Sequence, residues 1–394
     1  MWGRRLHPAM DRFAAVDALL EDEDLDGYLH VGAGSDSDVY YLSRFDAPDP
    51  FVLLRRPGET LLLVSLLEFG RAQKEADVDE VRCTEEYRSG DDRGDPEARA
   101  RILASFLDDE GVASVGVPRD FGLATAEYLR DDGVTVSVVD DVVGETREVK
   151  TAEEIAHVET AQRANERAMA TAQEMLREAT VDGDELVLDG EPLTAERVRT
   201  EIEVALIRND CALDQTIVAG GPDGADPHWR GSGPLPAAAP IVVDIFPRHS
   251  SKYHSDMTRT FVRGDVPDAV REMYDAVAVA KEAALDALDE GAGVTGDAVH
   301  GAVCDAFADR GWDTTRDDDV ERGFIHSTGH GVGLDVHEGP RLSEDAGELE
   351  AGNVVTVEPG LYDPDVGGVR LEDIVVVEGD GYRNLTEYEQ SIEP

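Results

Sequence analysis

Five residues in the C-terminal part of the chain have the types and the order that could hold metal ions: Asp244, Asp256, His330, Glu358 and Glu372. They occur in the segments VVDIFPR, YHSDMTRT, STGHGVG, TVEPGLY and VRLEDIV. Each lies in or beside a short apolar run that is typical of a β-strand, and a strand can hold a ligand rigidly. If they converge, they supply about four negative charges and one imidazole.

This ligand set favours hard divalent ions over zinc in a structural site. A structural zinc site is closed by four ligands, usually Cys and His. Five ligands that are mostly oxygen suit ions such as Mn²⁺, and they are enough to hold two of them. Two ions a few Å apart can share a hydroxide and stabilise both oxygens of a tetrahedral intermediate. The residues therefore predict hydrolysis of an amide or ester bond.

Acidic residues alone are weak evidence, because the chain has 86 of them and most must be solvated surface groups. Asp244 and Glu358 differ from the majority, since each follows an apolar run, at 240–243 and 354–357. A carboxylate buried at such a position needs a partner. Their placement therefore weakens the interpretation as ordinary surface groups, and it does not establish a functional role without the order of the motifs.

The order Asp, Asp, His, Glu, Glu, with GHGVGLDVHE around the histidine and EPG and RLED around the glutamates, resembles the pita-bread metallopeptidases. The nearest members of that family are Xaa-Pro aminopeptidase (aminopeptidase P) and Xaa-Pro dipeptidase (prolidase). The resemblance is strong over residues 150–390, whereas residues 1–145 resemble only the general shape of the family's N-terminal domain. It implies an α/β (α+β) chain with a creatinase-like N-terminal α/β domain at 1–145 and a pita-bread catalytic domain at 146–394.

The resemblance also assigns roles to the five residues. Asp244 would bind one metal ion, His330 and Glu358 the other, and Asp256 and Glu372 would bridge both. The cofactor would be two divalent ions per chain, Mn²⁺ or Co²⁺, with Zn²⁺ left open. Glu358 would also act as a catalytic proton shuttle, because a metal-bridging hydroxide needs a nearby carboxylate to take its proton.

Seven of the ten histidines fall between positions 228 and 337, where the site hypothesis places them. By resemblance, His228, His326 and His337 are catalytic residues that surround the substrate. They would donate hydrogen bonds to the scissile carbonyl and to the tetrahedral intermediate. His228 and His337 would thus bind substrate, and Arg370 is a further substrate-binding candidate that could pair with acids behind the site.

Helix and strand signatures place these residues on rigid elements. In the first 145 residues they alternate, with a hairpin about Pro57-Gly58-Glu59, which predicts an α/β domain. Thr151 and Glu154 form a capping-box signature that opens a long helix to about residue 179. Further helices are predicted at 194–209, 266–289 and 295–310.

Three segments of the C-terminal part lack such signatures. Residues 181–193 are acidic and contain glycine, so we expect a surface excursion. The stretch 220–240 has five glycines and five prolines around His228, and a structureless loop of that length is more often functional than not. His249 and His254, in the turn between the two aspartates, are expected to face solvent rather than bind metal.

Charge is the strongest compositional signal. There are 86 acidic and 36 basic residues, a net charge of −50, with only four lysines. With 41% hydrophobic residues this indicates a folded protein with a carboxylate-covered surface, and the composition resembles cytosolic proteins of extreme halophiles. A nucleic acid or an anionic membrane is a poor partner for such a surface. Three distant cysteines predict no disulfide framework, and no signal peptide or apolar span is visible, so we expect a cytoplasmic protein.

The leading functional hypothesis is a dinuclear metal-dependent exopeptidase that hydrolyses Xaa-Pro bonds in proline-containing peptides, of aminopeptidase P or prolidase type. The resemblance implies a homodimer, because a neighbouring subunit's N-terminal domain can close the cleft. One alternative is a non-peptide amidohydrolase of the same fold, an ectoine hydrolase or a creatinase-like enzyme. A strict creatinase lacks the full metal set. A second alternative, a binding module, is disfavoured because such relatives have lost the ligands.

Overall fold

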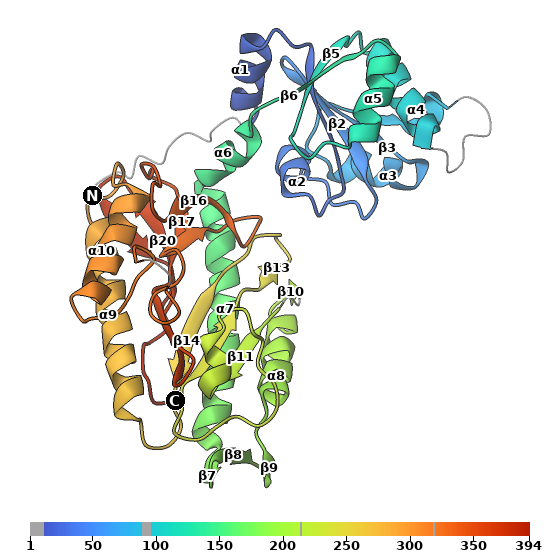
Figure 1. The fold of residues 1–394 in the computed structure, drawn as a ribbon. Coiled ribbons are helices and arrows are strands. Elements are labelled where there is room, and N and C mark those ends of the chain that lie inside the picture. Colours follow the sequence, from blue (N-terminus) through green and yellow to red (C-terminus); the bar gives the residue numbers. More distant parts are fainter. Residues whose placement is uncertain (1–11, 89–95, 213–214, 318–319) are drawn as a thin grey trace, which may run out of the picture. The chain divides into compact units, whose positions relative to one another are not determined.

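The N-terminal part of the chain forms a six-stranded mixed sheet flanked by helices (Figure 1). The computed structural model describes residues 12–88, 96–212, 215–317 and 320–394, and it divides into two units, residues 1–147 and 148–394. The strand order is β4-β3-β2-β1-β5-β6. The strands are β1 (Gly27–Gly32), β2 (Phe51–Arg56), β3 (Glu59–Val64), β4 (Glu80–Cys83), β5 (Ser114–Val117) and β6 (Thr135–Val138). The helices are α1 (Ala14–Asp22), α2 (Ser37–Ser43), α3 (Leu66–Glu75), the 3₁₀ turn η1 (Thr84–Glu86), α4 (Pro96–Asp109), α5 (Leu123–Asp131) and α6 (Val142–Glu148).

The predicted hairpin is present as β2 and β3, which pair antiparallel from Val52 opposite Leu63 to Arg56 opposite Glu59. Gly58 has a φ of 77°, a conformation that glycine adopts without steric cost. The outer pairs β3–β4 and β5–β6 are parallel, and helices connect them. The mixed α/β class predicted for this part is therefore confirmed.

The second unit is built from two helix pairs and two sheets. Its helices are α7 (Ala152–Glu178), α8 (Ala195–Ile207), α9 (Asp268–Leu288) and α10 (Gly296–Ala308). The capping box that predicts the start of α7 is present, since Thr151 Oγ1 accepts from Glu154 N at 3.3 Å and Glu154 Oε2 accepts from Thr151 N at 2.8 Å. Such a box satisfies two backbone donors that the first turn leaves free. The other predicted helices begin and end within two residues of the observed ones.

The two main sheets each carry part of the candidate site. The first has the order β11-β12-β14 and the second β16-β15-β17-β20-β21. Their strands are β11 (Ile217–Gly220), β12 (Ile241–Ile245), β14 (Met257–Phe261), β15 (Gly329–Gly331), β16 (Glu338–Leu342), β17 (Val354–Val357), β20 (Asp373–Glu378) and β21 (Gly381–Asn384). Smaller pairs are formed by β10 (Cys211–Ala212) with β13 (Arg248–His249), and by β18 (Gly360–Asp363) with β19 (Gly367–Arg370).

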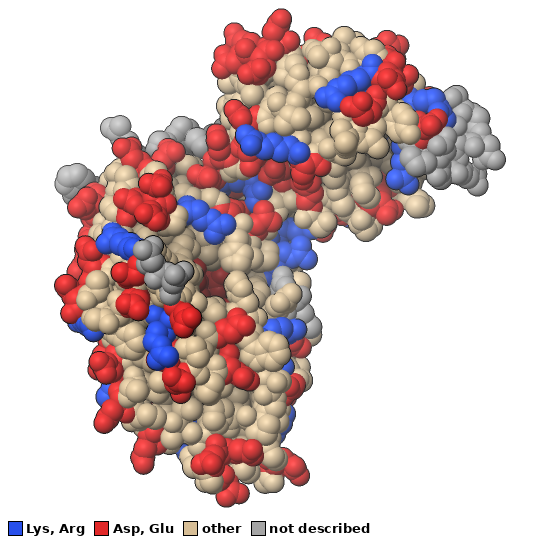
Figure 2. Space-filling view, viewed as in Figure 1, with Lys and Arg blue, Asp and Glu red and all other residues tan. Residues whose placement is uncertain are grey.

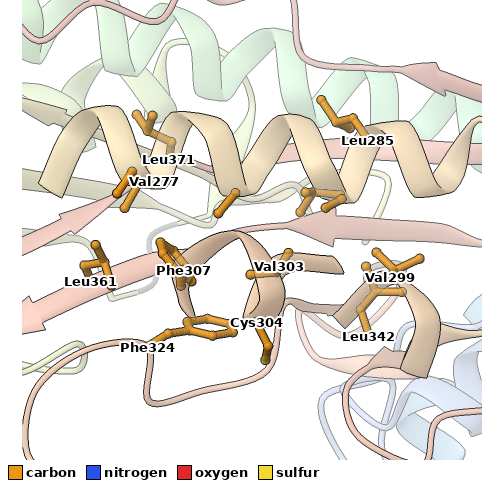
Figure 3. Packing of buried hydrophobic residues seen from close by; sticks show 14 of the residues in the cluster. Val277, Leu285, Val299, Val303, Cys304, Phe307, Phe324, Leu342, Leu361 and Leu371 are labelled. Atoms are coloured by element: carbon orange, nitrogen blue, oxygen red, sulfur yellow. The ribbon is translucent and has the colours of Figure 1, made fainter. Parts of the chain in front are cut away.

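Each sheet has its own apolar core. Residues of α7 and α8 pack against β11, β12 and β14, with Val198, Ile202 and Val243 fully buried. Residues of α9 and α10 pack against the second sheet, and Figure 3 shows Val277 of α9 and Phe307 of α10 among them. Each such buried side chain contributes about 1.5–3 kcal/mol. Along β12, Asp244 alternates with the core residues Val243 and Ile245, so its side chain lies on the other face of the sheet.

Two segments without clear signatures are ordered in ways the sequence analysis missed. Residues 181–193 are mostly exposed, as expected of a surface excursion, and they contribute to a small sheet of β7 (Thr180–Asp182), β8 (Glu185–Leu188) and β9 (Glu191–Pro192) that was not predicted. The stretch 220–240 is not structureless either. It begins with the 3₁₀ helix η2 (Gly221–Ala225), and Val218 N donates to Arg230 O at 3.1 Å. Gly231 has a φ of 73°, and a Cβ there would lie 1.9 Å from Val218 O, so only glycine allows this approach.

Among the charged side chains visible in Figure 2, acidic ones cover more of the surface of both units than basic ones. Cys83, Cys211 and Cys304 are buried and form no disulfide. Among the described residues, no helix is both long enough and apolar enough to cross a membrane.

Candidate metal centre

Two of the five predicted ligands lie on the first sheet. Asp244 is in the central strand β12, paired with Ile217 of β11 on one side and Thr258 of β14 on the other. Asp256 directly precedes β14. Both carboxylates are buried, with only 6% and 5% of their surface exposed. The strand pairing therefore holds two carboxylates inside the protein, where each needs a compensating charge.

The other three ligands come from the second sheet and its edge. His330 is the middle residue of β15, Glu358 directly follows β17, and Glu372 lies between β19 and β20. Glu358 N donates to Thr328 O at 2.9 Å, and Glu372 N donates to Thr258 O at 3.1 Å. The second of these bonds links the two sheets at the site.

Glycines on both sides of His330 let neighbouring main chain approach it closely. A Cβ on Gly329 would lie 2.0 Å from Thr356 O, and one on Gly331 would lie 2.0 Å from Gly339 O. His330 Nδ1 lies 3.1 Å from Gly331 O. Because a carbonyl oxygen can only accept, Nδ1 carries the proton in this bond, and Nε2 is directed at the carboxylates.

The structure brings the five side chains into one cluster. His330 Nε2 lies 3.2 Å from Glu358 Oε1 and 3.8 Å from Asp256 Oδ2. Ligand atoms of Asp256, His330 and Glu372 all lie within 4.8 Å of one another. Asp244 pairs with Arg370, Arg370 donates to Thr258 Oγ1, and Thr258 Oγ1 donates to Glu372, so a chain of bonds joins these two carboxylates.

The carboxylates of this cluster have opposite proton affinities. Burial raises the pKa of Asp256 well above its usual value, and the charges of Glu372 and Asp244 raise it further. Burial and the charges of Glu358 and Asp244 likewise raise the pKa of Glu372. The pKa of Glu358 is lowered to about 2, because the His330 and His326 imidazoles outweigh the opposing effect of burial. Arg370 also lowers the pKa of Asp256 and of Glu372, but not enough to offset burial and the neighbouring carboxylates.

These residues fit divalent cations. Asp244 Oδ1 and Glu372 Oε1 are buried and have no hydrogen-bond partner among the residues that the structure describes. Unpaired buried carboxylate oxygens are costly, and a cation is the partner that would satisfy both the charge and the free lone pairs. Carboxylate oxygens together with one imidazole are donors that suit ions such as Mn²⁺, whereas thiolates select softer metals.

The three predicted catalytic histidines lie at different depths. The ring of His337 stands edge-on to that of His330 at 4.3 Å, and burial together with the His330 imidazole lowers the pKa of His337 to about 4. His228 is exposed, and it lies close enough to His337 to affect that pKa. His326 is half-buried, with Nδ1 2.7 Å from Ser327 O and Nε2 3.0 Å from Tyr362 Oη. At neutral pH His337 is uncharged and can donate one N–H.

Arg370 is buried and forms an ion pair with Asp244, with Nη2 2.5 Å from Asp244 Oδ2. Its Nη1 donates to Tyr362 Oη at 2.9 Å and its Nε to Thr258 Oγ1 at 3.0 Å. Thr258 Oγ1 in turn donates to Glu372 Oε2 at 2.7 Å. Sequence reasoning missed Tyr362 and Thr258, because each looks like an ordinary strand residue. Their place directly beside the motifs EPG and SDM was the available signal.

Arg341 is a second residue that sequence reasoning missed. In the antiparallel pair β15–β16 it is directly opposite His330. Opposed residues of such a pair project from the same face of the sheet. The side chain of Arg341 is exposed, and its charge contributes to the low pKa of His337. A cation therefore stands at the border of the site.

One expectation about the turn between the aspartates is wrong. His254 does not face solvent: it is buried, and its backbone N donates to Gly333 O at 2.8 Å. The turn folds back onto the segment after His330, which removes His254 from water. His249 is partly buried, with Nδ1 3.0 Å from Ser251 Oγ.

Comparisons with known proteins agree with this geometry. The sequence profile of metallopeptidase family M24 matches residues 156–379. The chain is 33% identical over 258 residues to an Xaa-Pro dipeptidase of Pyrococcus furiosus, covering 64% of this chain and 67% of that protein. The prolidase of Pyrococcus horikoshii superposes with a TM-score of 0.80 at 25% identity, over 97% of this chain and 99% of that one. An X-Pro aminopeptidase of Thermotoga maritima gives a TM-score of 0.77 at 26% identity, over 94% and 99%.

Proposed function

Because this chain belongs to metallopeptidase family M24, we propose that it is a metal-dependent exopeptidase that hydrolyses Xaa-Pro peptide bonds. The observation that carries the proposal is the buried cluster of two aspartates, two glutamates and His330, with ligand atoms of Asp256, His330 and Glu372 within 4.8 Å of one another. Relatives that match most of this chain are named as Xaa-Pro dipeptidases or aminopeptidases, which supports the substrate class.

The cofactor in this proposal is a pair of divalent ions, Mn²⁺ or Co²⁺. Asp244 would hold one ion, His330 and Glu358 the other, and Asp256 and Glu372 both. The unpartnered oxygens Asp244 Oδ1 and Glu372 Oε1 support this assignment. When bound, the ions would polarise the scissile carbonyl and activate water.

The protein's own groups would orient the substrate and move protons. Glu358 is ionised at neutral pH because its pKa is lowered to about 2, and it is proposed as the carboxylate that takes the proton of the attacking water. His337, with a pKa of about 4, is a neutral donor for the carbonyl oxygen. His228 and His326 are proposed to assist it, and Arg370 is proposed to act on the substrate from beside Asp244.

Within this class, Arg341 favours a dipeptidase. A dipeptide ending in proline carries its free carboxylate next to the scissile bond, and a cation opposite His330 can pair with it. A longer peptide has no charge at that place. We therefore expect Arg341→Gln to reduce kcat/KM for Xaa-Pro dipeptides about tenfold or more, the range of one charge-assisted hydrogen bond. Xaa-Pro-Xaa tripeptides should be nearly unaffected.

The deciding experiment reconstitutes the protein with Mn²⁺ and assays Xaa-Pro dipeptides, Xaa-Pro-Xaa tripeptides, creatine and ectoine in parallel. Hydrolysis of the peptides supports the proposal. Turnover of creatine or ectoine without turnover of any Xaa-Pro peptide would instead identify a non-peptide amidohydrolase. Elemental analysis with no more than one tightly held ion per chain would exclude the two-ion assignment.

We further propose a creatinase-like N-terminal domain at 1–145, a pita-bread catalytic domain at 146–394, a homodimer and a cytoplasmic, halophilic protein. The buried, unpaired state of Cys83, Cys211 and Cys304 and the net charge of −50 support the last two. Light scattering on the purified protein tests the dimer.

A further inference from the structure

Arg259, in the middle of β14, is buried with 1% of its surface exposed, and every N–H of its guanidinium has an acceptor. An arginine has five such donors. Nη1 donates to Glu372 O at 2.6 Å and Thr258 O at 3.0 Å, Nη2 to Tyr388 O at 2.8 Å and Asp373 Oδ1 at 2.9 Å, and Nε to Glu389 O at 3.2 Å. The guanidinium is therefore held in one orientation.

Three of these five acceptors surround Glu372. Arg259 binds the carbonyl of Glu372 itself, the side chain of the next residue, Asp373, and the Thr258 carbonyl. The Thr258 carbonyl also accepts from Glu372 N at 3.1 Å. Thr258 Oγ1 donates to Glu372 Oε2 at 2.7 Å, whereas Oε1 is buried and has no hydrogen-bond partner in the described part of the chain. The direction of Oε1 is thus set by the main chain that Arg259 fixes.

The other two acceptors belong to the segment after β21. Tyr388 and Glu389 offer backbone carbonyls to Arg259, and the Tyr388 ring lies 5.8 Å from the guanidinium. The same segment is attached to the unit at both ends, because Leu385 N donates to Ile374 O at 2.8 Å and Val262 N donates to Ile392 O at 2.7 Å. Segment 385–392 is therefore packed beside the metal centre's supporting strand.

We propose that Arg259 is a positioning residue for Glu372, and that through Arg259 the segment 385–392 influences the affinity of the centre for the ions that Glu372 touches. This inference rests on the ligand role proposed for Glu372. The planar fork of an arginine can join three chain segments at fixed angles, which a lysine cannot. Partners behind a metal ligand typically change metal affinity 10- to 100-fold when they are removed.

A purely structural role is the competing explanation, since Arg259 also forms an ion pair with Asp373 at 2.9 Å. Lys281 of α9 provides the matched control. It is fully buried and pairs with the other oxygen of Asp373, with Nζ 2.5 Å from Oδ2. Lys281→Met therefore removes an equally buried cation from the same carboxylate while leaving the bonds from Arg259 to Glu372 O, Tyr388 O and Glu389 O in place.

The test compares Arg259→Lys, a chain ending at Glu387, and Lys281→Met. Mn²⁺ stoichiometry and affinity are measured by isothermal titration calorimetry, and the Tm of each metal-free protein is recorded. We expect Arg259→Lys and the shortened chain to bind Mn²⁺ 10- to 100-fold more weakly than the wild type, because Glu372 is proposed to touch both ions. Lys281→Met should bind both ions with wild-type affinity, whatever its Tm. Excess Mn²⁺ should restore kcat in Arg259→Lys.

Wild-type affinity for both ions in Arg259→Lys and in the shortened chain, with only a lower Tm, would overturn the proposal. If Arg259→Lys does not fold, the shortened chain decides alone. Equal loss of affinity in Lys281→Met would also overturn it, because the effect would then follow from the Asp373 ion pair. A wild-type protein that binds two ions but hydrolyses no Xaa-Pro peptide would contradict the proposed function and leave these binding measurements intact.

Discussion

The two sheets of the second unit contribute unequally to the candidate metal centre. The first sheet supplies only carboxylates, Asp244 and Asp256. The second supplies Glu358 and Glu372 together with His330, and His326 is close by. Glu358 is surrounded by imidazoles and has its pKa lowered to about 2, whereas burial and neighbouring carboxylates raise the pKa of Asp256. Two carboxylates of one cluster thus have opposite proton affinities, depending on which neighbours the fold provides.

This difference shows where the centre needs an external cation. The imidazoles already compensate Glu358, and Arg370 compensates one oxygen of Asp244. Asp256 has His330 Nε2 only at 3.8 Å, and Glu372 is in no ion pair among the described residues, although both carboxylates are almost fully buried. They are also the two residues proposed to touch both ions. Removing or protonating them should therefore affect the centre more than changes on the histidine side.

The largest effect is expected from Asp256→Asn. Losing one buried carboxylate removes charge that both ions share, and several kcal/mol of transition-state stabilisation correspond to about 10³-fold or more in kcat/KM. Elemental analysis should find fewer than two ions. The exposed Asp265→Asn is the control and should keep both ions. Full occupancy and activity in Asp256→Asn would remove Asp256 from the ligand set.

On the histidine side, His228→Ala and His337→Ala should keep both ions but lose turnover about 10²- to 10³-fold, the usual cost of one donor to a developing oxyanion. Steady-state kinetics and metal content on the same preparations measure both quantities. Loss of ions from either variant would mean that the histidine is a ligand. The assignment of ligands to the two sheets would then be wrong.

Metal affinity should rise with pH. In the metal-free protein the raised pKa values of Asp256 and Glu372 favour the protonated carboxyls, and an ion must displace those protons. Affinity should therefore increase about tenfold per pH unit while one proton is released, and level off above the raised pKa values. Calorimetry in buffers of different ionisation enthalpy counts the protons. An affinity that does not change with pH would contradict the raised pKa values.

The smallest and broadest effect concerns salt. With 86 acidic and 36 basic residues, the acidic surface groups repel one another at about 0.01 M salt, where the screening length is ~30 Å. Near 1 M salt the screening length falls to ~3 Å, and this repulsion is much weaker. Tm and Xaa-Pro hydrolysis should both rise along a KCl series up to molar concentrations. Mn²⁺ should partly replace KCl, because a ligand that binds only the folded state stabilises it. A Tm that stays flat or falls would reject the halophilic interpretation.

Much of the fold followed from local patterns. The capping box at Thr151 and Glu154 predicted where α7 begins, and the turn at Gly58 predicted the β2–β3 hairpin. Residues 181–193 were missed as a small sheet because their strands are two to four residues long and too short to show a period. His254 was placed wrongly for a different reason. Its backbone N donates to Gly333 O, which lies far along the chain, and a local sequence pattern cannot predict such a contact.

The sequence by itself determined which side chains could bind metal, since type and order in five motifs limit the chemistry before any fold is known. Only the tertiary structure decided how those side chains are charged and supported. The pairing of Arg370 with Asp244, the bond from Thr258 to Glu372 and four of the five bonds of Arg259 join residues more than 100 positions apart. Proton affinity in a buried cluster depends on distances of a few Å between such residues, and those distances exist only once both sheets have folded against each other.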